Sequence, residues 1–141
     1  MADIPHARPT RPRPLSPHLQ IYQWSVTMAT SITHRITGVA LYVGFVFIAW
    51  WLVAASMGPE AYEPFLAAAA NPIGQLVLFG FTWAAAYHLL NGIRHLAWDV
   101  GYGFLPKDAM WSGVVVVALS IIAAVGVFLW AYTVRMGGPV S

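Results

Sequence analysis

The chain has 141 residues, of which 59% are hydrophobic and only 9% are charged, with a formal net charge of +2 and no cysteine. Soluble domains carry about 25% charged residues, so this composition predicts an integral membrane protein. The lack of cysteine excludes a disulfide, an iron-sulfur cluster and a thiolate zinc site on this chain. A redox centre bound here would have to use histidine.

The first 28 residues read as a basic, proline-rich arm. Five prolines and three arginines lie among its first 17 positions, a composition that resists regular structure. Ser16 followed by Pro17 is a helix-start signal, and the apolar and aromatic residues that follow suit the headgroup zone of a membrane. We therefore expect residues 1–28 to form the arm and a short N-terminal interfacial helix, and residues 29–141 to form a transmembrane anchor domain.

Three long uncharged windows follow the arm. They are bounded by charged residues, from Arg35 to Glu60, from Glu63 to Arg94 and from Asp108 to Arg135. Each window exceeds the roughly 20 residues that a helix needs to cross a hydrocarbon core about 30 Å thick. The expected fold class is all-α integral membrane, an up-down-up bundle of three transmembrane helices at about 30–56, 72–98 and 109–134.

Breakers and caps separate the predicted spans. Gly58 and Pro59 end the first span, and an acidic connection leads to Asn71 and Pro72, which cap and start the second. Asp108 is expected to cap the third span.

The basic residues are unevenly distributed about these spans. Only Arg135 lies on the side of the acidic connection, and the other six lie on the opposite side: Arg8, Arg11, Arg13, Arg35, Arg94 and Lys107. By the positive-inside rule, the N-terminus and the second connection face the cytoplasm or the mitochondrial matrix. We expect a multi-pass protein of a bacterial cytoplasmic (inner) membrane, with a cytoplasmic N-terminus, rather than of the mitochondrial inner membrane.

The second span ends in an unusually polar stretch, YHLLNGIRHLAWD. With 3.6 residues per turn it has two polar faces, one with His88, Gly92, His95 and Asp99 and a neighbouring one with Tyr87, Asn91 and Arg94. Ionisable groups at membrane depth are costly and are usually functional. A neutral imidazole in an apolar setting can ligate a metal. Gly92 would let a flat macrocycle approach the helix, so haem bound by His88 is the natural candidate.

A second axial ligand has to come from elsewhere. His88 and His95 lie about 10.5 Å apart along the helix, whereas two ligands at about 2 Å from one iron lie about 4 Å apart. The first and second spans are antiparallel, which brings His34 level with His95. His88 is about 9 Å deeper than Arg94, beyond the expected reach of His34, so the other ligand is expected on another polypeptide. His34 and His95 would instead meet carboxylate groups at the edge of the macrocycle, together with Arg35.

Ser31 and Arg35 are spaced i, i+4 and therefore share one face of the first span. A hydroxyl donor beside a fixed cation suits hydrogen bonding and charge stabilisation at a quinone carbonyl. Taken singly, these residues have plainer interpretations. His88 could make a hydrogen bond between helices, Arg35 and Arg94 could be interfacial cations, and Arg94 with Asp99 could anchor a loop. The convergence of two polar clusters at one depth favours the functional interpretation.

Three motifs, RPLSPHLQIY, SITHRITG and YHLLNGIRHLAWD, occur in an order and spacing that resemble the cytochrome b556 subunits of succinate dehydrogenase, the membrane anchors of respiratory complex II. The resemblance covers roughly residues 13–134, although the third span matches only as a generic apolar helix. It implies that His88 is an axial ligand of haem b, with the other ligand from a small hydrophobic anchor subunit, and that His34, Arg35 and His95 contact the haem propionates. Ser31 and Arg35 would contribute to a ubiquinone site that the iron-sulfur subunit and the partner anchor complete.

In that family, succinate is oxidised on a flavoprotein subunit and electrons pass through iron-sulfur clusters to quinone. The resemblance therefore implies a non-flavin subunit that is not catalytic alone, with FAD and the clusters only on partners, in contact with lipid and with no nucleic acid. Alternatives are the anchor of a fumarate reductase, a cofactor-free structural anchor, or a transporter or proton-conducting subunit that uses His88 and Arg94. The short chain, the absence of inverted repeats and the lack of deep acidic residues argue against a transporter.

Overall fold

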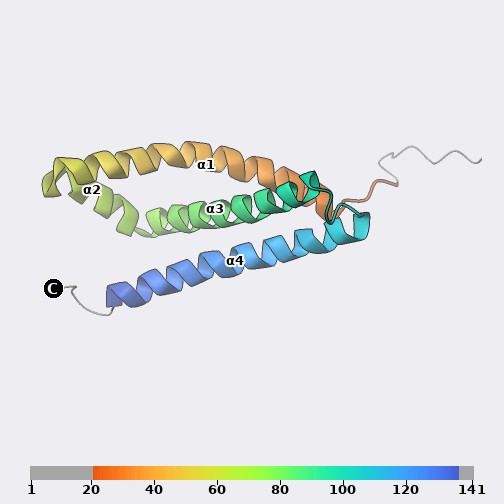
Figure 1. Cartoon of the computed structure of the whole chain (residues 1–141). Coiled ribbons are helices and arrows are strands. Elements are labelled where there is room, and N and C mark those ends of the chain that lie inside the picture. The colour runs from red at the N-terminus through yellow and green to blue at the C-terminus, as the bar shows by residue number, and fades with distance from the viewer. Residues whose placement is uncertain (1–20, 137–141) are drawn as a thin grey trace, which may run out of the picture.

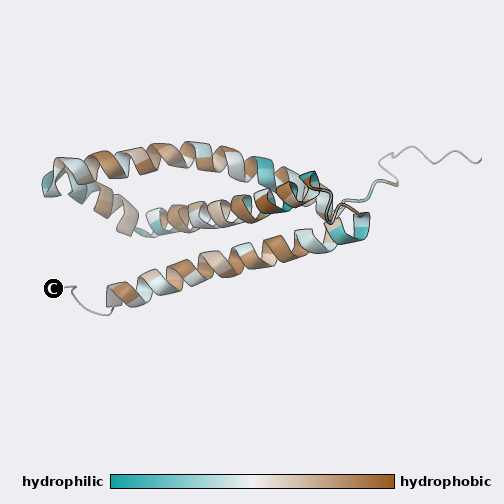
Figure 2. Cartoon of the chain, viewed as in Figure 1, coloured by the Kyte–Doolittle hydropathy of each residue, from teal (hydrophilic) through white to brown (hydrophobic). Residues whose placement is uncertain are grey.

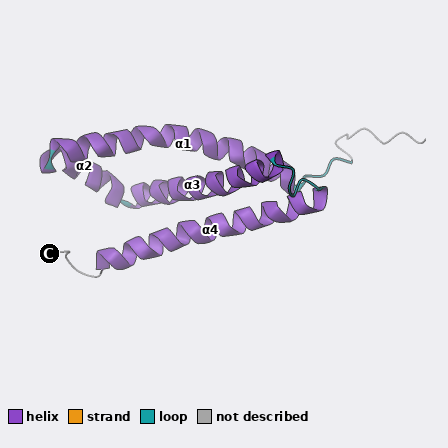
Figure 3. Cartoon of the chain, viewed as in Figure 1, coloured by secondary structure: helices purple, strands orange, loops and turns teal. Residues whose placement is uncertain are grey.

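The computed structural model describes residues 21–136, with side chains described as far as Val134. This part of the chain consists of helices joined by short connections, and it contains no strand (Figures 1 and 3). The helices are α1 (Val26–Met57), α2 (Pro59–Ala70), α3 (Pro72–Asp99) and α4 (Pro106–Met136). By length and composition, α1, α3 and α4 can each cross a membrane. The predicted all-α bundle of three spanning helices is confirmed, and each predicted span lies within one of these helices.

Helix α1 begins four residues before the predicted span. The side chain of Ser25 caps it by accepting a hydrogen bond from the Met28 N–H at 3.2 Å. Four additional residues correspond to about 6 Å of helix, so His34 lies more than a full turn farther from the helix start than expected. Ser25 gave no clear signal in the sequence because three other hydroxyl residues lie within the next six positions.

Of the two other predicted helix starts, the one at Asn71 is confirmed and the one at Asp108 is not. Asn71 caps α3 by accepting from the Gly74 N–H at 2.9 Å, and Pro72 occupies the first turn, as predicted. The prediction that Asp108 caps the third span is wrong. Helix α4 begins at Pro106, which places Asp108 inside its first turn, where a negative charge still interacts favourably with the helix dipole.

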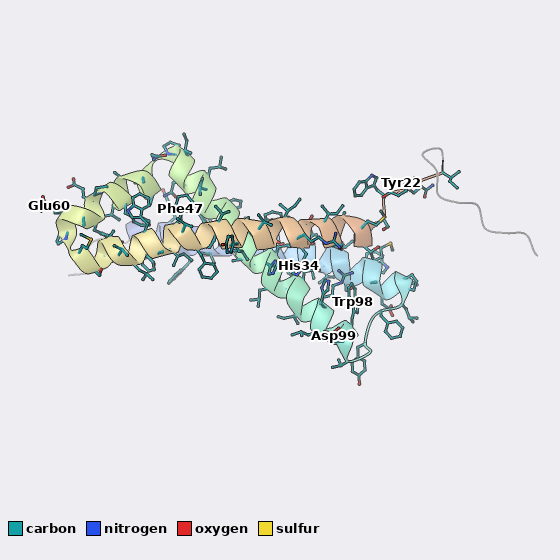
Figure 4. The ribbon with its side chains drawn as sticks, turned by 90° about the horizontal axis from the view of Figure 1, so that it is seen from above. Tyr22, His34, Phe47, Glu60, Trp98 and Asp99 are labelled. Carbon is teal, nitrogen blue, oxygen red and sulfur yellow. The ribbon has the colours of Figure 1, made fainter. Side chains whose placement is uncertain are left out.

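The acidic connection is itself a helix, α2, which the sequence interpretation did not foresee. Gly58 turns the chain with a φ of 101°, and α2 then doubles back beside α1 (Figure 1). The indole N–H of Trp51 donates to the Tyr62 hydroxyl at 3.2 Å, and the rings of Trp50 and Phe65 meet edge to face at 5.1 Å. Figure 4 shows Glu60 at the tip of the α1–α2 turn. These aromatic contacts and an alanine-rich C-terminal half stabilise α2.

Helix α3 lies between α1 and α4 along most of its length (Figure 1). Few apolar side chains are buried and most large ones are exposed, as expected where lipid replaces water. Figure 2 shows hydrophobic residues along all three long helices. Small residues allow close approach: Gly44 lies against the Phe81 ring, and Gly113 against Thr30. We call the end where α1 and α4 begin and α3 ends the basic end, because Arg35, Arg94 and Lys107 lie there. The opposite end, with Glu60 and Glu63, is the acidic end.

Residues 1–20, which include the predicted cap at Ser16 and Pro17, lie outside the described residues. Within the part that is described, residues 21–25 are not helical. Tyr22 and Trp24 are exposed, and their rings meet edge to face at 6.2 Å. The predicted interfacial helix therefore does not include residues 21–25.

Candidate functional site

Three histidines form a stack at the basic end. The ring of His34, from α1, lies between the rings of His88 and His95, both from α3 (Figure 4 labels His34 where α1 crosses α3). The ring centroids of His34 and His88 are 3.9 Å apart and the planes are 11° from parallel. Those of His34 and His95 are 5.1 Å apart at 17°. The predicted meeting of the start of the first span with the end of the second is therefore confirmed.

The expectation that His34 cannot reach His88 is wrong. Because α1 starts at Val26, His34 lies far enough along the helix to stack on His88. The contact nevertheless excludes His34 as a partner of His88 on one iron. Two such ligands point their nitrogens at the metal from opposite sides, about 2 Å each, whereas these rings lie face to face in van der Waals contact. The second axial ligand stays a prediction for another polypeptide.

One nitrogen of His88 is fixed by α1. Its Nδ1 is 3.2 Å from the Thr37 hydroxyl and 3.2 Å from the His34 carbonyl oxygen. A carbonyl can only accept, and the Thr37 hydroxyl is within 3.0 Å of the Thr33 and His34 carbonyls to which it can donate its own proton. This network assigns the proton to Nδ1 and the lone pair to Nε2. Within residues 21–134, Nε2 has no hydrogen-bond partner.

This arrangement fits a metal-ligating imidazole. Such a histidine usually donates its second ring N–H to a backbone carbonyl, which fixes the ring and leaves the other nitrogen for the metal. Among the described residues, no group of three or more histidine, cysteine or acidic side chains could hold a bare ion. A metal that arrives with its own equatorial ligands, as in haem, needs only axial nitrogens from the protein.

Two glycines shape the surroundings of His88. A Cβ atom on Gly38 would lie 3.1 Å from His88 Cε1, closer than an ordinary van der Waals contact, so any larger residue here would press on the ring. Gly92 lies one turn from His88 on the same face, and no chain atom lies within 4 Å of where its Cβ would be. The approach to α3 beside His88 is therefore open to a flat group.

His34 and His95 each have their Nδ1 atom turned into the bundle. Nδ1 of His95 donates to the Asn91 carbonyl at 2.7 Å. Nδ1 of His34 is enclosed and has no hydrogen-bond partner. Polar contacts with an external group would therefore use the Nε2 atoms of both rings.

Ser31 and Arg35 belong to the same stretch of α1 as His34, and neither hydrogen-bonds to the three stacked histidines within the described residues. Ser31 lines a shallow, open groove with Thr27, Met28 and Ile32. Arg35 is exposed, lies beside a second shallow groove, and makes no hydrogen bond within the described part of the chain. The structure therefore leaves the Arg35 guanidinium available to a group outside this chain.

Sequence reasoning missed a buried hub around Arg94, which it assigned to the interface or to loop anchoring. The side chain is only 7% exposed. It bonds to α1, α3 and α4, and its guanidinium carbon lies 4.1 Å from the centre of the Trp98 ring. The face shared by Tyr87, Asn91 and Arg94 was visible in the sequence, and all three are buried. What the helical period does not reveal is which face of α3 meets α1 and α4.

Comparisons with known proteins agree with this architecture. Residues 9–127 match the model of a family described as the succinate dehydrogenase/fumarate reductase transmembrane subunit. The succinate dehydrogenase cytochrome b556 subunit of Paracoccus denitrificans is 44% identical over 125 residues, covering 89% of this chain and 93% of that protein. The subunit of the same name from Rickettsia prowazekii is 41% identical, covering 84% and 90%. The mitochondrial cytochrome b560 subunit of Sus scrofa is 40% identical, covering 81% and 69%.

Proposed function

Because the chain belongs to the succinate dehydrogenase/fumarate reductase transmembrane subunit family, we propose that it is a haem b-carrying membrane anchor of a succinate:ubiquinone oxidoreductase. The observation that carries the proposal is the state of His88, whose Nδ1 is held by α1 while Nε2 has no hydrogen-bond partner in the described part of the chain. The cytochrome names of the relatives support the same assignment. Haem b, when bound, supplies a one-electron redox centre.

In this proposal, His88 is the axial ligand that this chain contributes. The His34 carbonyl and Thr37 keep its ring in one orientation and one tautomer. His34 and His95, together with Arg35, interact with the haem carboxylates, because the free nitrogens of both rings and an exposed cation are available at the basic end. The small hydrophobic anchor subunit supplies the opposite axial ligand.

Ser31 and Arg35 contribute to the quinone site. The Ser31 hydroxyl donates a hydrogen bond to a quinone carbonyl, and the Arg35 guanidinium stabilises the negative charge that develops on that oxygen during reduction. The groove beside Ser31 is shallow and open at the surface of α1, so a quinone could enter it from the lipid. The iron-sulfur subunit and the partner anchor complete the site.

The remaining chemistry belongs to partner subunits. The chain has no cysteine, so the iron-sulfur clusters, like the FAD at which succinate is oxidised, lie on the iron-sulfur and flavoprotein subunits. This chain docks the partner subunits at its basic end, which by the positive-inside rule lies on the cytoplasmic side of the inner membrane. The family description includes fumarate reductases, so a subunit that works in the reverse direction is the second candidate.

The test is purification of the complex through a tag on this chain, followed by mass identification of its subunits and a reduced-minus-oxidised spectrum. We expect a flavoprotein, an iron-sulfur protein and a small hydrophobic protein to copurify with a b-type haem signal. Copurification without that signal would support a cofactor-free anchor and refute the haem assignment. Relative rates of succinate oxidation and fumarate reduction with matched quinones distinguish the two directions.

A further inference from the structure

Arg94 is the most buried charged side chain in the described part of the chain, and nothing above gives it a role. Four of its hydrogen bonds reach groups on three helices. Nε donates to the Ser112 hydroxyl at 2.9 Å, Nη1 to the Asn91 side-chain carbonyl at 3.1 Å and to the Thr30 hydroxyl at 3.4 Å, and Nη2 to the Ala109 carbonyl. Thr30 belongs to α1, Asn91 to α3, and Ser112 and Ala109 to α4.

All of these acceptors are neutral, and no carboxylate within residues 21–134 forms a salt bridge with Arg94. Burying an uncompensated charge is costly, and here hydrogen bonds and the Trp98 ring replace the lost hydration. The arrangement requires the planar fork of arginine. The ammonium of a lysine is a point charge and cannot reach three helices at fixed angles.

The contacts of Arg94 fix the beginning of α1. The hydroxyl of Tyr87 donates to the Thr30 carbonyl at 2.8 Å, so α3 holds Thr30 by both its backbone and its side chain. A Cβ atom on Gly113 would lie 3.3 Å from Thr30 Cγ2 and 3.5 Å from Arg94, which shows how closely α4 approaches this point. Thr30 immediately precedes Ser31 and lies one turn before His34. The rotation and height of α1 at Thr30 therefore set where both side chains lie.

Arg94 also contacts Asn91 and Trp98, two residues that lie against His95. Its bond to the Asn91 side-chain oxygen fixes Asn91, whose backbone carbonyl accepts from His95 Nδ1 at 2.7 Å. The Trp98 ring stacks under the guanidinium and lies 4.9 Å from the His95 ring. The Arg94 side chain thus contacts the residues that position Ser31, His34 and His95.

We propose that Arg94 is a positioning residue for the haem and quinone sites, which holds the beginnings of α1 and α4 against the end of α3 through its guanidinium fork. This rests on the proposed function for the identity of the sites. The fork, and not the positive charge alone, carries the role.

The experiment uses the purified complex with Arg94→Lys, which keeps the charge and removes the fork. Lys107→Arg, at an exposed position at the start of α4, is the matched control, because it exchanges the same two side chains and also keeps the charge. We expect Arg94→Lys to raise the quinone KM about tenfold, while succinate oxidation with a soluble acceptor stays within twofold of the wild type. We expect Lys107→Arg to change neither. Wild-type quinone kinetics in Arg94→Lys would overturn the proposal, because charge alone would then suffice.

A distance measurement tests the positioning without relying on either cofactor. The chain has no cysteine, so Ala29→Cys on α1 and Val114→Cys on α4, both exposed, introduce its only two thiols for spin labels. Complexes that carry only one of the two substitutions are measured as controls, because they show the contribution of spin labels attached to partner subunits. We expect a narrow distance distribution with Arg94 and a broader or shifted one with Arg94→Lys. An unchanged distance distribution would overturn the proposal. This holds even in a complex without haem, so the positioning role can be tested separately from the proposed function, which the lack of haem would refute.

If Arg94→Lys does not assemble, Ser112→Ala removes one arm of the fork and leaves the charge in place. We expect it to broaden the distance distribution and raise the quinone KM by a smaller factor in the same direction. A Ser112→Ala complex that matches the wild type in both measurements would overturn the role of the fork.

Discussion

The two ends of the bundle are held together by different kinds of contact. At the basic end, α1, α3 and α4 are joined by directional hydrogen bonds centred on Arg94, Tyr87 and Thr30. At the acidic end, α1 and α2 are joined mainly by aromatic rings, with one exposed bond from Trp51 to Tyr62. Hydrogen bonds fix angles and height, whereas apolar packing tolerates small shifts. The end that must place several polar side chains relative to one another is the end with directional contacts.

The largest effect on activity is expected at the exposed polar face of the basic end. Arg35→Ala removes a cation that has no partner within the described residues, so we expect quinone reduction to fall about 100-fold, a loss typical of removing one charge-stabilising group. Ser31→Ala removes a single hydrogen bond, and we expect it to lower the rate of quinone reduction about tenfold. Assays of succinate with quinone and with a soluble acceptor separate the two steps. Equal losses with both acceptors would contradict this assignment.

Crowding the histidine stack should have the next largest effect. Gly38→Val places methyl groups against the His88 ring, where even a Cβ atom would lie 3.1 Å away, and overpacking of this kind costs about 1–3 kcal/mol. We expect the haem content per complex to fall several-fold, measured from the difference spectrum. Gly126→Val on α4, where no chain atom lies within 4 Å of the Cβ position, is the control. Full haem content in Gly38→Val would show that the His88 ring does not need this space.

A smaller effect is expected from one arm of the basic-end network. Tyr87→Phe removes the hydroxyl that donates to the Thr30 carbonyl, and we expect a loss of about 1 kcal/mol in stability, the usual net contribution of a neutral hydrogen bond. Thermal denaturation of the complex in detergent measures it. Tyr42→Phe removes a hydroxyl from a side chain that is 78% exposed and should leave the melting temperature unchanged. A Tyr87→Phe complex as stable as the Tyr42→Phe complex would argue against the directional role.

The smallest effect is expected at the acidic end. Trp51→Phe removes the exposed bond to Tyr62 and keeps an aromatic ring beside α2, so we expect a change in stability below about 1 kcal/mol. The haem spectrum and the quinone kinetics should match the wild type. A change in either would show that the two ends are coupled along α1.

The sequence predicted the number of spans and their convergence, because uncharged windows and helical rise depend only on residue type and spacing. It did not predict α2, whose stability comes from aromatic contacts with α1 that no local pattern reveals. It placed His34 too close to the start of its helix, because Ser25 is one of several hydroxyl residues that could cap α1. Arg94 was assigned to the interface because the face that a helix turns toward its neighbours is set by packing between elements.

The most direct test of the haem assignment is the reduced-minus-oxidised spectrum of the purified complex with His88→Ala, beside His95→Ala and, as a histidine that no proposal uses, His6→Ala. Because His88 alone has its Nδ1 held by α1 and its Nε2 directed to no partner in the described chain, we expect the low-spin b-type signal to be lost in His88→Ala. The signal should persist in the other two complexes. A normal low-spin signal in His88→Ala would contradict the ligand assignment and the proposed role of the histidine stack.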